Sequence, residues 1–263
     1  MDVRGAVVDL DGTVYRGDSL VDGAREGVAA LRDHGVDPLF VTNNPTRSPA
    51  EYARRLGEFG LDVTADRVLS AGSVTARYLA ANHDGEATFV VGSDGLREQL
   101  RAVGVALTDD PGAAEVVVTS HTYGFDYEAL TEGLWALRST ETFVGTDPDL
   151  TYPSADGRDR PGSGAITRAV GGVAARDPDH EFGKPSPETL AAIRERLDCA
   201  PEHCLVVGDR LDTDVALGVR GGMLTALVLS GSTSRAQYDA RDADAHPTPD
   251  HVFEHLGSLG TVL

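Results

Sequence analysis

Four short, mostly apolar runs along this chain each lead to a polar residue that can take part in chemistry. Two of them end directly at such a residue, Ala6–Val8 at Asp9 and Pro38–Val41 at Thr42, and in the other two, His180–Phe182 and Leu205–Val207, one glycine precedes Lys184 and Asp209. In an open parallel α/β sheet, ligands bind beyond the carboxyl ends of the strands. We therefore expect these side chains to meet in one crevice, where two carboxylates, a hydroxyl and an ammonium can transfer a phosphoryl group.

Helix signals separate these runs. Asp22 is placed to cap a helix that ends near Gly35, Ser48–Glu51 combines a capping box with a proline at the first helical position, and Ser186–Glu188 starts a further helix. A strand at Leu224–Leu229 follows. Strands that alternate with helices of this length predict an α/β fold with a parallel sheet and right-handed crossovers.

The middle of the chain repeats the alternation without the reactive residues. Strand-like runs occur at Thr88–Val91, Glu115–Val118 and Thr142–Val144, with helical stretches between them. We interpret residues 73–181 as an inserted α/β domain that shapes the site. Residues 1–72 and 182–263 then form the catalytic domain.

The net charge limits the kinds of partner that the protein can bind. The 42 acidic residues exceed the 23 basic ones and give a formal net charge of −19, which argues against nucleic acid or an anionic membrane as a partner. The acidic residues are dispersed and lysine is almost absent, which leads to the hypothesis of a halophilic source.

The sequence also favours a cytoplasmic location. No apolar run approaches the roughly 18 residues of a membrane span, and the start of the chain lacks the features of a signal peptide. Cys199 and Cys204 have no second pair with which to form a zinc site. We expect both to be ordinary thiols in a reducing compartment.

The acidic residues at the strand ends suggest both a nucleophile and a metal site. Asp9 can attack as a nucleophile while Asp11, beyond the turn that Gly12 eases, serves as general acid and base. If Asp9, Asp11, Asp209 and Asp214 converge, their repulsion requires a cation, and Mg²⁺ prefers such oxygen ligands. We expect Asp212 only to cap the following helix.

Lys184 and Thr42 fit the neutralisation of the phosphoryl oxygens. A Gly-Lys-Pro segment on its own is usually a surface turn, but the company of the other three sites favours a functional lysine. Asn43 and Asn44, which follow Thr42, are candidates for positioning hydrogen bonds to the substrate.

These motifs together resemble the haloacid dehalogenase superfamily of phosphatases over essentially the whole chain. They are Asp9–Thr13, Thr42, Gly183–Ser186 and Gly208–Asp214, in the order typical of that family. The insertion resembles the C2-type α/β cap domain of its NagD-like and p-nitrophenyl phosphatase branch. Thr146–Asp149 and Pro161–Ala165 are similar to segments that recur there, although Asp147 stands where the family usually has asparagine.

The resemblance implies a Rossmann-like core with an inserted cap domain, and a set of roles. Asp9 would be the nucleophile, Asp11 the general acid and base, and Thr42 and Lys184 would hold the transferring group. Asp9, the Asp11 backbone carbonyl and Asp209 would bind Mg²⁺, with Asp214 in support. Asp147 in the cap domain would contribute to substrate binding.

The expected activity is therefore Mg²⁺-dependent hydrolysis of a small soluble phosphate ester through an aspartyl-phosphate intermediate. A sugar or glycerol phosphate fits, and p-nitrophenyl phosphate would be an artificial substrate. Relatives often dimerise through the cap domain, so a homodimer is possible. Arg158 and Arg160 have two interpretations, a solvated hairpin, which we prefer, or contact with the leaving group.

Two other classes of function remain open. One is a catalytically silent binding or scaffold protein that retains the fold, although every motif residue is intact. The other, less favoured, is a phosphate-accepting signalling receiver domain. In a receiver the acidic pair and the accepting aspartate follow different strands, whereas here both carboxylates lie in Asp9–Asp11.

Overall fold

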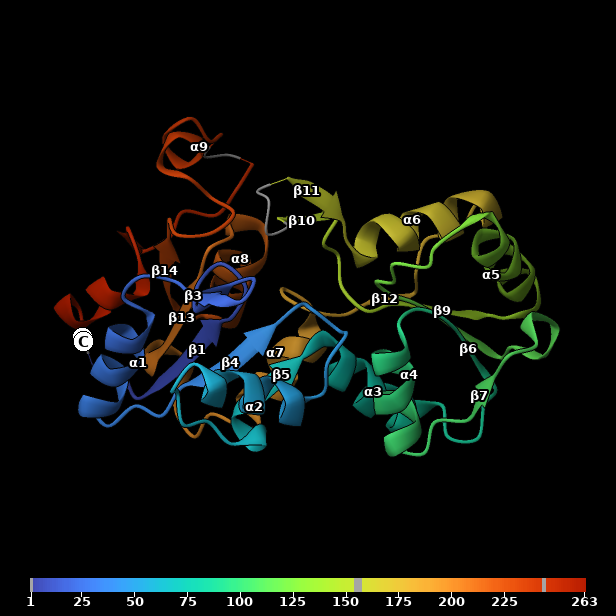
Figure 1. The fold of residues 1–263 in the computed structure, drawn as a ribbon, viewed down its shortest axis with the longest axis horizontal. Helices are drawn as coiled ribbons and strands as arrows, with labels where there is room; N and C mark the ends of the chain where they lie inside the picture. Colours follow the sequence, from blue (N-terminus) through green and yellow to red (C-terminus); the bar gives the residue numbers. More distant parts are fainter. Residues whose placement is uncertain (1, 154–157, 243–244) are drawn as a thin grey trace. The chain divides into compact units, whose positions relative to one another are not determined.

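The computed structural model describes residues 2–153, 158–242 and 245–263, and the fold has two compact units (Figure 1). The first unit comprises Met1–Thr42, Tyr52–Leu69 and Lys184–Leu263, and the second comprises Asn43–Glu51 and Ser70–Gly183. The chain therefore leaves the first unit twice, briefly after Thr42 and then for the long segment that precedes Lys184.

The first unit is built on a six-stranded sheet with the order β15-β14-β13-β1-β4-β5. β1 pairs in parallel with β13 on one side and with β4 on the other, and β13–β14 and β14–β15 are also parallel. All five residues of β1 and of β13 are buried, as expected for central strands covered on both faces. The strands are β1 (Gly5–Asp9), β4 (Leu39–Thr42), β5 (Val68–Ser70), β13 (Cys204–Gly208), β14 (Leu224–Val228) and β15 (His251–Phe253).

A small antiparallel hairpin and several helices complete this unit. The hairpin consists of β2 (Tyr15–Arg16) and β3 (Ser19–Leu20). The helices are α1 (Ala24–Asp33), α2 (Pro49–Glu58, which belongs to this unit from Tyr52 onward), α7 (Pro187–Arg194), α8 (Ala216–Gly221) and α9 (Arg235–Asp239). There are 3-10 turns at η1 (Ala65–Arg67), η3 (Pro201–His203) and η5 (Leu256–Thr261) and a π-helical turn at η4 (Leu211–Val215).

The second unit has its own parallel sheet of five strands, with the order β12-β9-β8-β6-β7. Phe89, Val117 and Phe143 from this sheet pack with Ile166 and Val170 into a separate apolar core. The strands are β6 (Thr88–Val91), β7 (Leu107–Thr108), β8 (Val116–Thr119), β9 (Thr142–Gly145) and β12 (His180–Glu181), with a hairpin of β10 (Thr151–Pro153) and β11 (Asp159–Pro161). The helices are α3 (Ala71–Asn82), α4 (Asp94–Ala102), α5 (Tyr127–Ser139) and α6 (Ser163–Ala174), with a 3-10 turn at η2 (Pro111–Ala113).

The predicted α/β fold with parallel sheets is confirmed. The two helix N-termini predicted at Ser48 and at Asp22 have different outcomes. The capping box of α2 is present, because Ser48 N donates to Glu51 Oε2 at 2.8 Å and Glu51 N donates to Ser48 Oγ at 3.3 Å. Asp22 does not cap α1. That position belongs to Gly23, whose φ of 76° turns the chain into the helix without a side-chain hydrogen bond.

The expectation of two ordinary thiols is wrong, because the structure joins Cys199 and Cys204 in a disulfide. The chain turns through η3 between them and brings their Cα atoms to 6.7 Å, within the range that a disulfide spans. Spacing alone does not reveal this turn.

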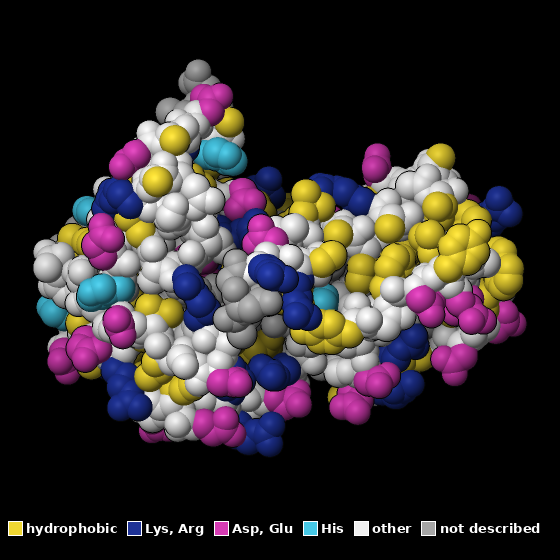
Figure 2. All heavy atoms as spheres, turned by 45° about the horizontal axis from the view of Figure 1, so that its top comes forward, with side chains coloured by type: hydrophobic (Ala, Val, Ile, Leu, Met, Phe, Trp, Pro, Cys, Tyr) yellow, Lys and Arg dark blue, Asp and Glu magenta, His cyan; other side chains and the backbone are white. Residues whose placement is uncertain are grey.

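None of the described helices is long and apolar enough to cross a membrane. Acidic side chains are scattered over the face shown in Figure 2 and do not gather into a single patch. Asp156 and Gly157, in the predicted loop that contains Arg158, lie outside the described residues.

Candidate active site

Neighbouring strands bring Asp9 and Asp209 to one edge of the first sheet. Asp9 is the last residue of β1 and Asp209 directly follows β13, and the register pairs Val8 with Val207. Because the two strands run parallel, both carboxylates leave the sheet at the same end. Asp9 is 6% exposed and Asp209 is 1% exposed, so two acidic groups are withdrawn from water together.

A tight turn follows Asp9 and carries Asp11. Leu10 O accepts hydrogen bonds from Val14 N at 2.9 Å and Tyr15 N at 3.1 Å, and Gly12 N donates to Tyr15 O at 2.8 Å. Gly12 has a φ of 95°, which favours glycine. Asp11 is exposed to solvent, and its Oδ2 accepts from Thr42 Oγ1 at 3.4 Å.

Lys184 lies among these carboxylates and is 2% exposed. Its Nζ donates to Asp9 Oδ1, to Asp214 Oδ1 at 2.7 Å and to Val41 O at 3.0 Å. Burial alone would lower the pKa of Lys184, but the carboxylates of Asp214 and Asp9 outweigh it and raise this pKa. Lys184 therefore stays protonated and bridges β1, β4 and the turn that carries Asp214.

The strand that precedes Lys184 belongs to a different sheet from the one predicted. The strand that precedes it, β12, pairs with β9 in the second sheet, so the expectation that all four runs end strands of one sheet is wrong for this residue. Lys184 is instead the first residue of the chain's return to the first unit. The apolar pattern alone does not show to which sheet a short strand belongs.

Asp214 is held in the site by a π-helical turn, η4. Val215 N and Asp214 N both donate to Arg210 O at 3.2 Å, and Arg210 N donates to Asp214 Oδ2 at 3.1 Å. Such turns are rare and occur frequently at functional sites. Asp212 does not cap the helix as expected, because its carboxylate pairs with the guanidinium of Arg210 at 2.9 Å.

The electrostatics of this cluster favour a bound cation. Burial is the main cause that raises the pKa of Asp9 well above its usual value, and it raises the pKa of Asp209 to about 6. Lys184 opposes this shift, while the charge of Asp214 adds to it. A single ammonium thus faces three buried carboxylates, an arrangement that is costly without further positive charge.

The arrangement of oxygen atoms fits a divalent metal ion. Asp9, Asp209 and Asp214 each offer a carboxylate oxygen, and these atoms all lie within 4.8 Å of one another. Asp9 Oδ2 is buried and has no hydrogen-bond partner among the described residues. Hard cations such as Mg²⁺ take carboxylate and carbonyl oxygens of this kind.

The loop after β14 is a part of the site that the sequence reasoning missed. Ser230 Oγ donates to Gly12 O at 2.8 Å, Ser232 N donates to Asp209 Oδ2, and Thr233 N donates to Asp209 O at 3.2 Å. A Cβ on Gly231 would lie 1.9 Å from Asp209 Oδ2, so glycine allows this close approach. The segment Ser230–Ser234, rich in Gly and Ser at a strand end, was the available signal.

Three predicted substrate-binding residues belong to the second unit and are not part of the carboxylate cluster. Asn43 follows Thr42 in the chain, and its Nδ2 donates to Asp149 Oδ1 at 3.3 Å. Asn44 Oδ1 accepts from Thr46 N at 3.1 Å, which is a local turn. Asp147 is 2% exposed. A Cβ added to Gly183 would lie 2.9 Å from the Cβ of Asp147 and 2.9 Å from the Oδ1 of Asn43, so Gly183 packs closely against both residues.

Asp147 is an unusual buried carboxylate. Its Oδ2 accepts from Thr146 Oγ1 at 3.1 Å and its Oδ1 from Asp149 N at 3.3 Å. Burial, followed by the charge of Asp149, raises its pKa well above the usual value in spite of the hydroxyl of Ser163 and these other donors.

Comparison with known proteins shows to which family the chain belongs. A family model described as haloacid dehalogenase-like hydrolase matches residues 6–106, and a related model of the same superfamily matches residues 181–259. Chronophin of Mus musculus is 36% identical over 97% of this chain and 91% of its own length. The chain belongs to the haloacid dehalogenase-like hydrolases.

Within this family the chain is a NagD-like phosphatase. The acid sugar phosphatase of Staphylococcus saprophyticus is 32% identical over 96% of this chain and 95% of its own length. The structure of a p-nitrophenyl phosphatase from Archaeoglobus fulgidus superposes with a TM-score of 0.91 at 34% identity and covers 100% of both chains. Phosphatases of this family generally use a divalent metal ion, and the cluster of Asp9, Asp209 and Asp214 is the candidate for it.

Proposed function

We propose that this phosphatase is a Mg²⁺-dependent phosphomonoesterase that acts on a small soluble phosphate ester through an aspartyl-phosphate intermediate. The observation that carries the proposal is the position of Asp9. One of its carboxylate oxygens contacts Lys184, the other has no hydrogen-bond partner among the described residues, and Asp209 and Asp214 lie beside it.

In the first half of the reaction, an oxygen of Asp9 attacks phosphorus and the bond to the ester oxygen breaks. Asp11 donates a proton to the departing oxygen, so an alcohol leaves and the phosphoryl group remains on Asp9. Lys184 and Thr42 donate hydrogen bonds to the phosphoryl oxygens and stabilise their charge in the transition state.

In the second half, Asp11 accepts a proton from a water molecule, which attacks phosphorus. The bond between phosphorus and the Asp9 oxygen breaks, and inorganic phosphate and the free carboxylate are restored. Asp9, the backbone carbonyl of Asp11 and Asp209 would hold Mg²⁺, with Asp214 in support. The bound ion would neutralise the charge of the phosphoryl oxygens and of the carboxylates around them.

The names of the relatives support a small substrate. They include an acid sugar phosphatase and a p-nitrophenyl phosphatase. We propose a sugar phosphate, glycerol phosphate or similar ester as the class, with substrate choice assigned to the second unit through Asp147, Asn43 and Asn44. A cytoplasmic location, a halophilic source and a homodimer through the second unit are also parts of the proposal.

The decisive experiment is release of p-nitrophenol from p-nitrophenyl phosphate in molar KCl, with Mg²⁺ and with a chelator. We expect activity that requires the metal and falls at least about 10³-fold in Asp9→Asn. Asp33→Asn, at an exposed end of α1, is the matched control and should retain full activity.

Two outcomes would contradict the proposal. Activity that survives in Asp9→Asn would mean that the nucleophile is wrong. A folded protein without activity on this ester and on a panel of small phosphates would favour the silent scaffold instead.

A further inference from the structure

The backbone at Asp11 is tied to the hairpin that follows it. Asp11 forms an isolated β-bridge with Tyr15, the first residue of β2, and Gly12 N donates to Tyr15 O at 2.8 Å. Val21 N donates to Val14 O at 3.0 Å and closes the base of the hairpin. Movement of Tyr15 would therefore carry the backbone of Asp11 with it.

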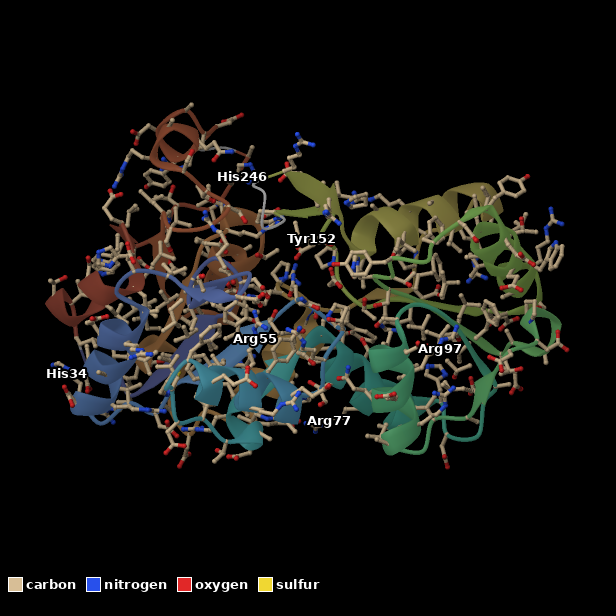
Figure 3. The ribbon with its side chains drawn as sticks, in the orientation of Figure 1. His34, Arg55, Arg77, Arg97, Tyr152 and His246 are labelled. Carbon is tan, nitrogen blue, oxygen red and sulfur yellow. A yellow bond between two sulfur atoms is a disulfide. The ribbon has the colours of Figure 1, made fainter. Side chains whose placement is uncertain are left out.

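Arg55 of α2, which is labelled in Figure 3, contacts this hairpin at Tyr15 and at the turn that contains Gly17. Its guanidinium carbon lies 4.8 Å from the ring centroid of Tyr15 and 5.5 Å from that of Phe59, and the two rings are 5.7 Å apart. Its Nη2 also donates to Gly17 O and to Asp18 Oδ1 at 3.1 Å. One side chain thus holds both the ring of Tyr15 and the turn that joins β2 to β3.

These contacts come at a cost that an apolar side chain without N–H groups would avoid. The side chain of Arg55 is 17% exposed, and its Nε is buried without a hydrogen-bond partner among the described residues. A buried N–H without an acceptor is destabilising. Methionine would cover the rings of Tyr15 and Phe59 without this cost, but it has no donor for Gly17 O. The guanidinium combines ring stacking with this hydrogen bond.

We propose that Arg55 is a positioning residue for the phosphatase reaction, which fixes the hairpin and, through Tyr15, the backbone of Asp11. The proposal rests on the proposed function, in which Asp11 donates a proton to the leaving group. Displacement of a reacting group by about 1 Å can cost roughly 100-fold in rate. Loss of Arg55 should therefore impair the step in which Asp11 delivers its proton.

The leaving group separates this role from a merely structural one. p-Nitrophenolate is a stable anion that departs with little protonation, whereas an alkoxide needs a proton as it leaves. The ratio of kcat/KM for p-nitrophenyl phosphate to kcat/KM for glycerol phosphate, which we call the leaving-group ratio, measures how strongly the reaction depends on this proton. A variant that is partly unfolded loses both activities by the same factor, and this ratio stays constant.

The test compares Arg55→Met with Arg54→Met, which removes an exposed arginine from the adjacent position of the same helix. For Arg55→Met we expect kcat/KM to fall roughly 10- to 30-fold with glycerol phosphate and less than about threefold with p-nitrophenyl phosphate. Arg54→Met should change neither. Arg55→Lys retains a donor for Gly17 O but not the planar stacking group, and should restore part of the loss.

Hydrogen exchange gives a readout that does not depend on activity. Arg55→Met should speed exchange of the amides in residues 12–21 and leave that of β13 unchanged. An unchanged leaving-group ratio overturns the proposal. A changed ratio with unchanged exchange also overturns it, because Arg55 would then act by a route other than the hairpin.

Asp11→Asn separates this proposal from the proposed function. If this variant keeps the wild-type ratio, the assignment of Asp11 as general acid is wrong and the Arg55 proposal falls with it. If the ratio changes in Asp11→Asn but not in Arg55→Met, only the Arg55 proposal is overturned.

Discussion

Lys184 and Asp214 form a buried ion pair with 2.7 Å between Nζ and Oδ1, and each residue is 2% exposed. Lys184 also pairs with Asp9, so a single cation compensates two carboxylates on different elements. It is the only lysine in the chain, whose other basic residues are arginines. A compact ammonium can enter a space between two carboxylates and a backbone carbonyl that the broad guanidinium does not fit as readily.

We expect Lys184→Met to destabilise the protein by about 3–5 kcal/mol, because it leaves buried carboxylates without their cation. Urea unfolding at pH 7 in the presence of chelator measures this loss. Arg54→Met removes an exposed positive charge and should change the free energy of unfolding by no more than about 0.5 kcal/mol. Similar stabilities for the two variants would mean that Lys184 does not compensate the cluster.

Divalent metal ions should stabilise the folded protein through Asp209. Saturation of the site with Mg²⁺ at about 100 times its Kd would add about 2.7 kcal/mol and raise the melting temperature. Asp209→Asn should abolish most of this response. Asp212→Asn is the matched control, because Asp212 lies in the same motif but pairs with Arg210 and is half exposed. An equal response of both variants to Mg²⁺ would place the metal elsewhere.

Close packing around Asp209 predicts a marked effect of Gly231→Ala. The added Cβ would lie 1.9 Å from Oδ2 and 2.5 Å from Cβ of Asp209, so the loop or the carboxylate must shift. We expect weaker Mg²⁺ binding, measured by calorimetry, and lower stability. The control is Gly57→Ala on α2, where the added Cβ would have no other atom within 4 Å. This substitution should stabilise the helix by about 0.5–1 kcal/mol. Unaltered metal affinity in Gly231→Ala would show that the loop does not position Asp209.

The sequence predicts the position of a residue in the fold where that position depends only on the strand that precedes the residue. Asp9, Thr42 and Asp209 end or follow strands of the first sheet, and the apolar runs that predict those strands are local signals. Lys184 was predicted at the site for a partly wrong reason, because its strand belongs to the other sheet. The pairing partner of a two-residue strand depends on contacts far away in the chain.

The contribution of the Ser230–Thr233 loop and of Arg55 depends on tertiary contacts between residues that lie far apart in the chain. Ser230 donates to the carbonyl of Gly12, 218 residues earlier, and Arg55 donates to that of Gly17, 38 residues earlier. Cys199 and Cys204 are close in the chain, but their disulfide depends on the η3 turn between them, which their spacing alone does not reveal. The fold class and the strand ends that carry Asp9, Thr42 and Asp209 are readable from the sequence, but the groups that contact these residues require the structure.

The excess of acidic residues predicts that the protein gains stability with salt. A net charge of −19 makes the surface self-repelling, and molar KCl shortens the Debye length to about 3 Å. The free energy of unfolding should therefore rise between about 0.1 M and 2 M KCl. Stability that falls as KCl rises would contradict the halophilic hypothesis.

Asp147 predicts a pH dependence of stability with a definite sign. Burial raises its pKa in the folded protein, so the folded state binds its proton more tightly than the unfolded state does. Between the ordinary aspartate pKa of about 4 and the raised value, the contribution of this group to stability falls as the pH increases. Asp147→Asn should remove that slope.

At pH 8 we expect Asp147→Asn to melt a few degrees higher than the wild type, because each kcal/mol of added unfolding free energy raises the melting temperature by about 2–4 °C. At pH 4 the melting temperatures of the two proteins should differ little. Asp84→Asn, at an exposed turn of the same unit, should have no effect at either pH. A lower melting temperature for Asp147→Asn at pH 8 would mean that the ionised carboxylate is stabilised by its neighbours. Unchanged selectivity of this variant across a panel of phosphate esters would remove Asp147 from the residues that choose the substrate.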